Sequence, residues 1–345
     1  MNTISTEHKI SVPHMVAGGL FTLCILGALV VHTVPALLAG LLAFVLTRTL
    51  LTRLRRWDRN RKLLSHELLS GVIVGVGSLA VLAVTSVLVA QFLGGESLRA
   101  FMLTLAETVS QVKQYLPEGL AVYLPDSLLE LRAMAAGALK EHANVVAGLG
   151  SHIMHSLLLT LIGWITGVLA AVSLSTSAAG SEPQPVFFAE WSRLWALLSN
   201  SFKNVAWAQT KIAAINAFMT GSFLLIVMPL LGWHLPYAKT LILATFLLGL
   251  IPVVGNLLSN ALICTLALSV AFPAALVSLG FLVLIHKLEY FLNARIQGHE
   301  IGAKAWELLI VLFTFELLFG PAGMVAAPVI YAFIKADLRR IGWLR

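Results

Sequence analysis

The amino-acid sequence predicts an all-α, polytopic membrane protein. Of its 345 residues, 59% are hydrophobic and only 11% are charged, whereas soluble domains carry roughly 25% charged residues. The mean hydropathy is +0.90, and several apolar runs approach the length of about 20 residues that a helix needs to cross a bilayer. We expect about six full spans, two discontinuous or re-entrant hairpins and amphipathic surface helices; the alternative is a count of eight spans.

The N-terminal region 1–93 is expected to hold a transmembrane hairpin and a third span. The hairpin consists of Val12–Val31 and Val34–Leu51, which are joined by too few residues for anything but a tight turn. The loop that follows is rich in Arg, and short basic loops stay in the cytoplasm. This loop orients the chain with both termini in the cytoplasm, and it accounts for much of the net charge of +7 without a nucleic-acid partner.

The third span, Leu68–Phe92, leads outward, and its Gly71 and Gly75 have the spacing that permits close helix contact. The extracytoplasmic region 94–152 differs in kind, because its apolar residues recur at helical spacing with charged residues between them. We expect amphipathic helices there that lie on the membrane surface or pack against a neighbouring subunit. A homo-oligomer is therefore predicted.

Region 153–238 is expected to combine transmembrane spans with a cytoplasmic amphipathic helix. Ile153–Leu174 returns inward, and Ile212–Leu231 leads outward again. Between these spans, aromatic and aliphatic residues recur every three or four positions from Phe188 to Val205. This Trp-rich pattern is typical of a helix that lies at the membrane interface.

The C-terminal region 239–338 is the predicted transport core, because Pro and Gly interrupt two of its apolar segments. The interruptions lie near Pro252 and Gly320. Backbone that leaves a helix inside a bilayer must be buried in protein or line a cavity, and paired broken helices mark the binding sites of many transporters. We expect a hairpin entered from outside at 239–270, a crossing at 272–288 and a hairpin entered from inside at 305–334.

Polar residues near these interruptions are the candidate substrate-binding or ion-binding groups. Asn256 and Asn260 lie one helical turn apart after the first interruption. Glu316 stands among apolar residues, where a carboxylate that faces lipid costs roughly 2.5–3.5 kcal/mol. We expect it to face the protein interior, where it binds a proton or forms a structural hydrogen bond. The complete candidate set is Pro252, Gly255, Asn256, Asn260, Glu289, Asn293, Arg295, Glu316, Gly320 and Gly323.

Motifs of soluble enzymes and ATP-driven pumps are absent from the sequence. It contains no GxxxxGK[S/T] phosphate loop, no HExxH zinc motif and no GxSxG nucleophile motif. His152 and His155 share a helix face, but no third metal ligand is in register with them. We therefore expect a protein that is not an enzyme and has no cofactor or metal site. Its expected partners are the lipid bilayer and a small-molecule or ion substrate.

Three motifs of the C-terminal half carry a resemblance to a known family. They are Ile251–Gly255, Lys287–Gly298 and Gly320–Pro328. Together with the order of the segments, these motifs make the chain resemble the autoinducer-2 exporter-like (AI-2E) family of bacterial permeases over nearly its whole length. Ala206–Gln209 also resembles the Ala-Gln or Gly-Gln pair that this family usually has before the fifth span.

The resemblance implies a secondary transporter of the bacterial cytoplasmic (inner) membrane that assembles as a homo-oligomer. The implied function is export of a small polar metabolite such as an autoinducer-2-like signal, and a Na⁺ (Li⁺)/H⁺ antiporter is the alternative within transport. A non-transporting membrane scaffold is the alternative of another class. Glu289, Asn293 and Arg295 are expected either to form an intracellular gate or polar substrate contact, or to anchor the end of the sixth span at the interface.

Overall fold

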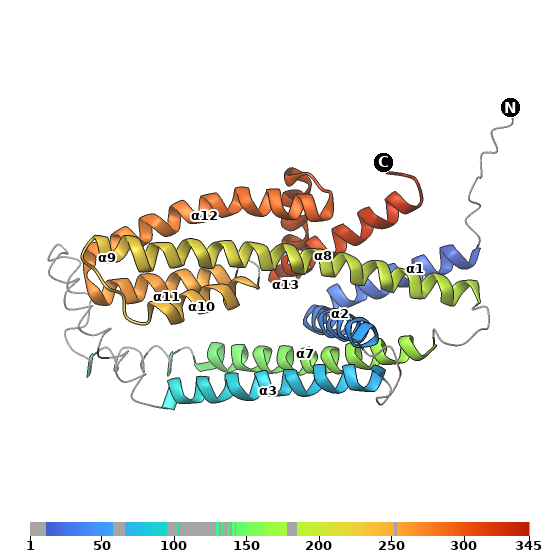
Figure 1. Ribbon diagram of the computed structural model, residues 1–345, viewed down its shortest axis with the longest axis horizontal. Coiled ribbons are helices and arrows are strands. Elements are labelled where there is room, and N and C mark those ends of the chain that lie inside the picture. Colours follow the sequence, from blue (N-terminus) through green and yellow to red (C-terminus); the bar gives the residue numbers. More distant parts are fainter. Residues whose placement is uncertain are drawn as a thin grey trace. The chain divides into compact units, whose positions relative to one another are not determined.

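The computed structural model describes residues 12–57, 66–94, 143–177, 185–251 and 254–344, with a few single residues between 95 and 142. Over these ranges the chain forms helices and no strand (Figure 1), which confirms the predicted all-α class. The chain divides into two compact units: residues 1–76, 155–205 and 307–345 form the first, and residues 77–154 and 206–306 form the second. Most of the predicted surface region 94–152 lies outside the described residues, so its amphipathic helices stay a prediction.

Several of the described helices are long and apolar enough to cross a membrane. They are Val34–Trp57, Gly150–Leu174, Val186–Leu230 and Ala305–Arg340. Shorter apolar helices accompany them at Met15–Val30, His66–Ala80, Ala238–Gly249, Gly255–Val270 and Phe272–Leu288. The chain is therefore a polytopic helical membrane protein, as the composition predicts.

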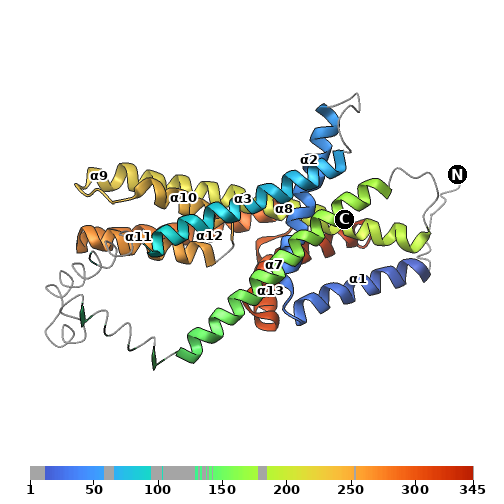
Figure 2. The same cartoon turned by 90° about the horizontal axis from the view of Figure 1, so that it is seen from below.

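Helices α1 (Val12–Val30) and α2 (Val34–Trp57) follow each other directly in the first unit, where the sequence predicts a transmembrane hairpin. They meet near the turn and then diverge, so they do not pack side by side (Figure 2). The turn between them is tight, because His32 adopts a left-handed conformation with φ 58°. The Thr33 hydroxyl donates a 3.2 Å hydrogen bond to the Ala28 carbonyl oxygen at the end of α1. This bond satisfies one of the carbonyl groups that a helix end leaves without an internal partner.

Helix α7 (Ala143–Ser177) packs backbone to backbone against α2. A Cβ atom added to Gly163 would lie 2.0 Å from the Ala36 carbonyl oxygen, and one added to Gly167 would lie 2.1 Å from the Gly40 carbonyl oxygen. No side chain fits at either position. Small residues let membrane helices approach closely, and the close approach supplies the van der Waals contact that holds them together in lipid.

Helix α3 (His66–Gly94) makes a similar but looser contact with α7. A Cβ atom on Gly71 would lie 3.0 Å from the Val172 side chain, whereas one on Gly75 would meet nothing within 4 Å. Of the glycine pair that the sequence singles out in this span, Gly71 thus makes the close contact with α7.

Helix α8 (Val186–Ser222) continues without interruption into a π-helical turn, η1 (Phe223–Val227), and then α9 (Met228–Leu230). The sequence predicts an interfacial helix and a span here, and the structure joins both in one continuous helix. Which part of it lies at the membrane interface stays a prediction. No Gly or Pro occurs between Val186 and Thr220 to end the helix. Pro229 cannot donate a backbone hydrogen bond. It lies in α9, shortly after the π-helical turn, and the helix ends at Leu230.

The first half of α8 lies beside α1 (Figures 1 and 2). The Phe21 ring of α1 packs edge-on against Trp191 and Trp195, with centroid separations of 5.4 and 5.1 Å. Phe333 adds a third aromatic contact to Phe21 at 5.4 Å. These aromatic contacts join α1, α8 and the C-terminal part of the chain within the first unit.

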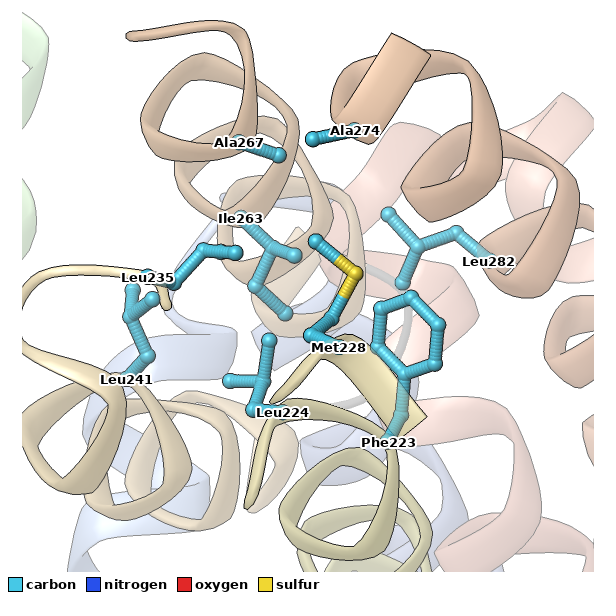
Figure 3. Packing of buried hydrophobic residues seen from close by; sticks show 9 residues of the cluster. All are labelled: Phe223, Leu224, Met228, Leu235, Leu241, Ile263, Ala267, Ala274 and Leu282. Atoms are coloured by element: carbon cyan, nitrogen blue, oxygen red, sulfur yellow. The ribbon is translucent and has the colours of Figure 1, made fainter. Parts of the chain in front are cut away.

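In the second unit, α10 (Ala238–Gly249), α11 (Val254–Val270) and α12 (Phe272–Ile301) pack around the end of α8 and η1. Met228 is 0% exposed and lies among Leu224, Ile263 and Leu282 (Figure 3). The rings of Phe223 and Phe281 stack nearly parallel, with centroids 3.9 Å apart. This apolar cluster fixes the helices that carry the first interruption.

Helix α13 (Ala305–Arg340) reverses its direction at Gly320, where φ is 68° and ψ is −161°. Essentially only glycine adopts this conformation. The Glu307 carboxylate accepts hydrogen bonds from the Tyr331 hydroxyl at 2.5 Å and from Lys335 Nζ at 2.6 Å. Tyr331 is 24 residues away from Glu307, which a straight helix would place about 36 Å apart at 1.5 Å per residue. The two arms of α13 therefore run antiparallel, as the predicted second hairpin requires.

A cluster of charged residues connects the end of α13 to the start of α8. Glu190 is buried and forms ion pairs with Arg193 and with Arg340, the latter at 3.1 Å. Asp337 lies 3.0 Å from Arg340 on the same helix. The C-terminal end of α13 and the beginning of α8 thus lie at the same end of the first unit, as expected if both face the cytoplasm.

The glycine contact between α2 and α7 predicts that Gly163→Val destabilises the folded chain. Overpacking typically costs about 1–3 kcal/mol, and here the added carbons would meet backbone that cannot rotate away. Thermal unfolding of the purified protein in mild detergent measures the effect. Gly75→Val is the matched control, because it places the same side chain in another membrane helix where a Cβ atom meets nothing within 4 Å. Equal losses in the two variants would contradict the proposed contact.

Candidate functional site

Helices α10 and α11 form a hairpin whose turn contains the first interruption. The hydroxyl oxygens of Thr245 and Ser259 lie 2.9 Å apart, both buried, and tie the two arms together near the tip. The arms contain 12 and 17 residues, which correspond to about 18 and 26 Å of helix. Both are shorter than the hydrocarbon core of about 30 Å. The lengths therefore suit a helix pair that turns back inside the bilayer.

The start of α11 packs directly on the end of α10. A Cβ atom on Gly255 would lie 1.7 Å from the Leu248 carbonyl oxygen, so only glycine fits there. The next residue, Asn256, has its Oδ1 atom 3.5 Å from the position that a Cβ atom on Gly249 would take. Two of the candidate residues, Gly255 and Asn256, thus lie at the tip of the hairpin. A third, Pro252, lies outside the described residues.

Gln209 of α8 satisfies the backbone at the end of α10. Its Nε2 atom donates a 2.7 Å hydrogen bond to the Gly249 carbonyl oxygen, and the side chain is only 7% exposed. The last four carbonyl groups of any helix lack an internal partner, and no water replaces that partner inside a bilayer. Gln209 supplies it at the point where α10 ends.

Gln297 of α12 lies on the other side of the same amide. Its Nε2 atom is 3.5 Å from Gln209 Oε1, a long contact between two buried side chains. The Gln209 amide therefore faces Gly249 through its nitrogen and Gln297 through its oxygen. A single buried side chain connects α8, the tip of α10 and α12 within the second unit.

An ion pair lies beside this amide cluster. Lys211 of α8 pairs with Glu300 of α12, with side chains 42% and 22% exposed. The Lys211 ammonium group also lies 5.6 Å from the centre of the Trp207 ring. Gly298 lies near the end of α12, where a Cβ atom would come within 2.7 Å of the Ala303 carbonyl oxygen. The middle sequence motif thus ends in α12, at a glycine that packs against the tight turn after this helix.

The other polar candidates of the second unit lie on α11 and α12. Asn260 follows Asn256 by one turn and is partly buried, and Arg295 is exposed. Glu289 and Asn293 belong to α12, but their side chains lie outside what the structure describes. The gate and anchor roles considered for these residues therefore stay predictions.

Gly320 and Gly323 shape the bend of α13 in the first unit. A Cβ atom on Gly323 would lie 2.5 Å from the Phe315 carbonyl oxygen and 2.5 Å from Phe319 Cβ, so the arms meet backbone to backbone near the bend. Glu316 is exposed in the described chain and does not face its interior, in contrast to the expectation from the sequence. The rings of Phe315 and Phe319 contact each other at 5.5 Å on one side of the arm. The position after Phe315 points about 100° away from it around the helix.

The groups gathered at the first hairpin tip are amides, hydroxyls and one ion pair. Such groups form hydrogen bonds with a polar solute and can release it again. Among the residues that the structure describes, no three His, Cys, Asp or Glu side chains are placed to hold a metal ion. The amides and hydroxyls described above bond to one another or to the backbone, so they hold the hairpin tip in place.

Gln209 and Gln297 are the members of this site that sequence reasoning did not select. In the sequence, Gln209 stands out only as part of an Ala-Gln pair, and Gln297 only as part of the middle motif. Both belong to continuous helices, so no Pro or Gly next to them marks a special position. Their burial and their contact across 88 residues of chain become visible only in the folded structure.

Comparison with protein families matches residues 15–342 to the family described as AI-2E family transporter. The matched range includes both hairpins, α12 and Gln209. A comparison with curated proteins finds no match.

Loss of the Gln209 hydrogen bond is predicted to destabilise the tip of the first hairpin. Gln209→Leu keeps most of the volume but leaves the Gly249 carbonyl oxygen buried without a donor, which costs about 1–3 kcal/mol. Thermal unfolding in detergent should show the loss of stability. Amide hydrogen exchange should rise mainly in the peptide that covers residues 245–259.

The control for this experiment is Asn204→Leu, which makes the same type of change at an exposed position of α8. It should leave both the unfolding temperature and the exchange of residues 245–259 near those of the parent protein. Unchanged exchange in Gln209→Leu would show that Gln209 does not hold the tip.

Proposed function

Because the chain belongs to the AI-2E family of transporters, we propose that it is a secondary transporter that exports a small polar metabolite, such as an autoinducer-2-like signal, across the bacterial inner membrane. The observation that carries this proposal is the bent α10–α11 hairpin. Its Gly255 turn brings Asn256 next to the end of α10, whose last carbonyl group is held by Gln209. Broken helices of this type supply the substrate sites of many secondary transporters.

In the proposed mechanism, each hairpin forms part of a gate. The α10–α11 hairpin is proposed to enter from the outer side and to open a solute site near Asn256 and Asn260, and the α13 hairpin is proposed to enter from the inner side. Different contacts stabilise the two bends. Gln209 holds the first tip, whereas the contact of Glu307 with Tyr331 and Lys335 holds the arms of the second together at its open end.

The position of Glu316 supports the proposed homo-oligomer. Its neighbours Phe313 and Leu317 are 67% and 87% exposed, so this arm of α13 presents an apolar surface that contains an exposed carboxylate. An ionised carboxylate facing lipid costs roughly 2.5–3.5 kcal/mol on insertion scales. Coverage by a second copy of the chain lowers this cost where that copy offers the carboxylate a hydrogen-bond donor or a cation.

Glu316 also favours the second candidate function, a Na⁺ (Li⁺)/H⁺ antiporter. A carboxylate in an apolar membrane segment is a group that can carry a proton or bind a monovalent cation. The export proposal assigns Glu316 to coupling or assembly, and the antiporter assigns it to ion binding. A non-transporting scaffold assigns it no role in flux.

Reconstitution into proteoliposomes distinguishes these functions. We expect flux of a labelled sugar-like solute that depends on the protein and continues without Na⁺. Proton movement driven by Na⁺ steps, followed with a pH-sensitive dye and without solute flux, would instead establish antiport. Absence of both, in protein that is folded by thermal unfolding, would favour the scaffold.

The tight Gly255 turn predicts that Gly255→Ala lowers flux strongly. The added methyl group would displace the Leu248 carbonyl group, and overpacking costs roughly 1–3 kcal/mol. A shift of that size changes the population of the native tip by about tenfold for each 1.4 kcal/mol. Initial flux rates at equal protein density measure the effect.

Gly280→Ala is the matched control, because a Cβ atom on this α12 residue meets nothing within 4 Å. It should transport like the parent protein. If Gly255→Ala also transports at the parental rate, the bend does not take part in the transport cycle.

A further inference from the structure

A polar pocket in the first unit lies between α2, α7 and the first half of α8. Its volume is about 510 Å³, which falls within the roughly 300–1,000 Å³ of typical small-molecule sites. Its lining includes Arg48 and Thr49 of α2, and Trp195, Asn200 and Lys203 of α8. No residue of either hairpin lines it, so this pocket is distinct from the candidate transport site.

The charge of the pocket is of one sign. Arg48 and Lys203 both line it, and no Asp or Glu does. Within the described part of the chain neither cation forms an ion pair, and the Arg48 guanidinium lies 5.6 Å from the centre of the Phe44 ring. A cleft lined by charges of one sign concentrates ions of the opposite sign. The pocket is therefore suited to an anion.

The strongest hydrogen-bond donors of the pocket are its two cations. The hydroxyl groups of Thr52 and Ser199 donate to carbonyl oxygens of their own helices, at 2.8 and 2.7 Å. Arg48, Lys203 and the Asn200 amide, with the hydroxyl groups of Thr49 and Ser192, thus remain to donate to a ligand. Guanidinium and ammonium groups bind phosphate oxygens through strong, charge-assisted hydrogen bonds.

The remaining wall of the pocket is apolar. Phe44, Val45, Leu174 and Trp195 line this side, which suits the glycerol and upper acyl carbons of a lipid better than a fully hydrated ion. The pocket lies at the end of α2 that continues into further basic residues, so the positive-inside rule places it at the cytoplasmic surface of the bilayer. Basic pockets between membrane helices on that side bind the headgroups of anionic lipids.

We propose that this pocket binds a phosphate-bearing anion through Arg48 and Lys203, with the headgroup of an anionic phospholipid of the inner leaflet as its source. The bound phosphate brings the two cations together and thereby connects α2 to α8. A soluble phosphate compound shares this chemistry but does not use the apolar wall. The two sources therefore differ in the affinity that their acyl chains contribute.

The test uses the full-length protein in a mild neutral detergent and three probes. These are dioctanoyl phosphatidylglycerol, the zwitterionic dioctanoyl phosphatidylcholine and inorganic phosphate, each titrated by isothermal calorimetry. We expect saturable binding of phosphatidylglycerol and much weaker binding of the other two. The double variant Arg48→Gln/Lys203→Gln should weaken phosphatidylglycerol binding by about tenfold or more, because it removes both charge-assisted contacts.

The control is Arg53→Gln/Arg56→Gln, which removes the same charge from α2 outside the pocket lining and should change the affinity by less than about threefold. Equal weakening in the two double variants, or no saturable binding of any probe to the parent protein, overturns the proposal. Inorganic phosphate that binds as tightly as the lipid, and with the same sensitivity to Arg48 and Lys203, overturns the lipid source and supports a soluble anion. Lys203→Gln alone provides the same comparison if the double variant does not fold.

Discussion

The structure depends first on the rule that backbone polar groups inside a bilayer need partners within the protein. In the proposed re-entrant arrangement, the rule applies at the end of α10, where the helix stops after 12 residues. Gln209 meets it by donating to the Gly249 carbonyl oxygen. Gln209 lies in the middle of the continuous helix α8, which positions its side chain against the end of α10. The continuous helix and the broken one therefore depend on each other.

The second organising constraint is the distance at which helices approach. In lipid there is little hydrophobic force between helices, so contact area comes from close backbone packing. Gly163, Gly255 and Gly323 serve this purpose in three places, where an added Cβ atom would lie 2.5 Å or less from a neighbouring backbone oxygen. One position joins two spans, and the other two close the hairpins. The same small residue thus sets both the packing of the scaffold and the shape of the bends.

The first unit contains two groups of charged residues, one around Glu190 and one that lines the pocket, and they differ in whether opposite charges are paired. Glu190 is buried because Arg193 and Arg340 neutralise it, and this cluster joins the ends of α8 and α13. Arg48 and Lys203 face a cavity in which no carboxylate lies. Pairing inside the protein produces a structural contact, whereas cations that share a cavity produce a binding site for an anion. The proposed lipid site therefore depends on Arg48 and Lys203 and not on the residues of the two bends.

The sequence by itself determined the class of protein, the positions of the two bends and the location of Gly255, Asn256, Gly320 and Gly323 at them. These features depend on local chemistry, because apolar length predicts membrane helices and Pro or Gly interrupts them. Only the tertiary structure decided that α8 is continuous, that Gln209 and Gln297 meet, and that Glu316 is exposed. Those outcomes depend on which distant helices pack together, since Gln209 and Gln297 are 88 residues apart. A polar residue inside a regular helix has no local signal that tells which partner it will face.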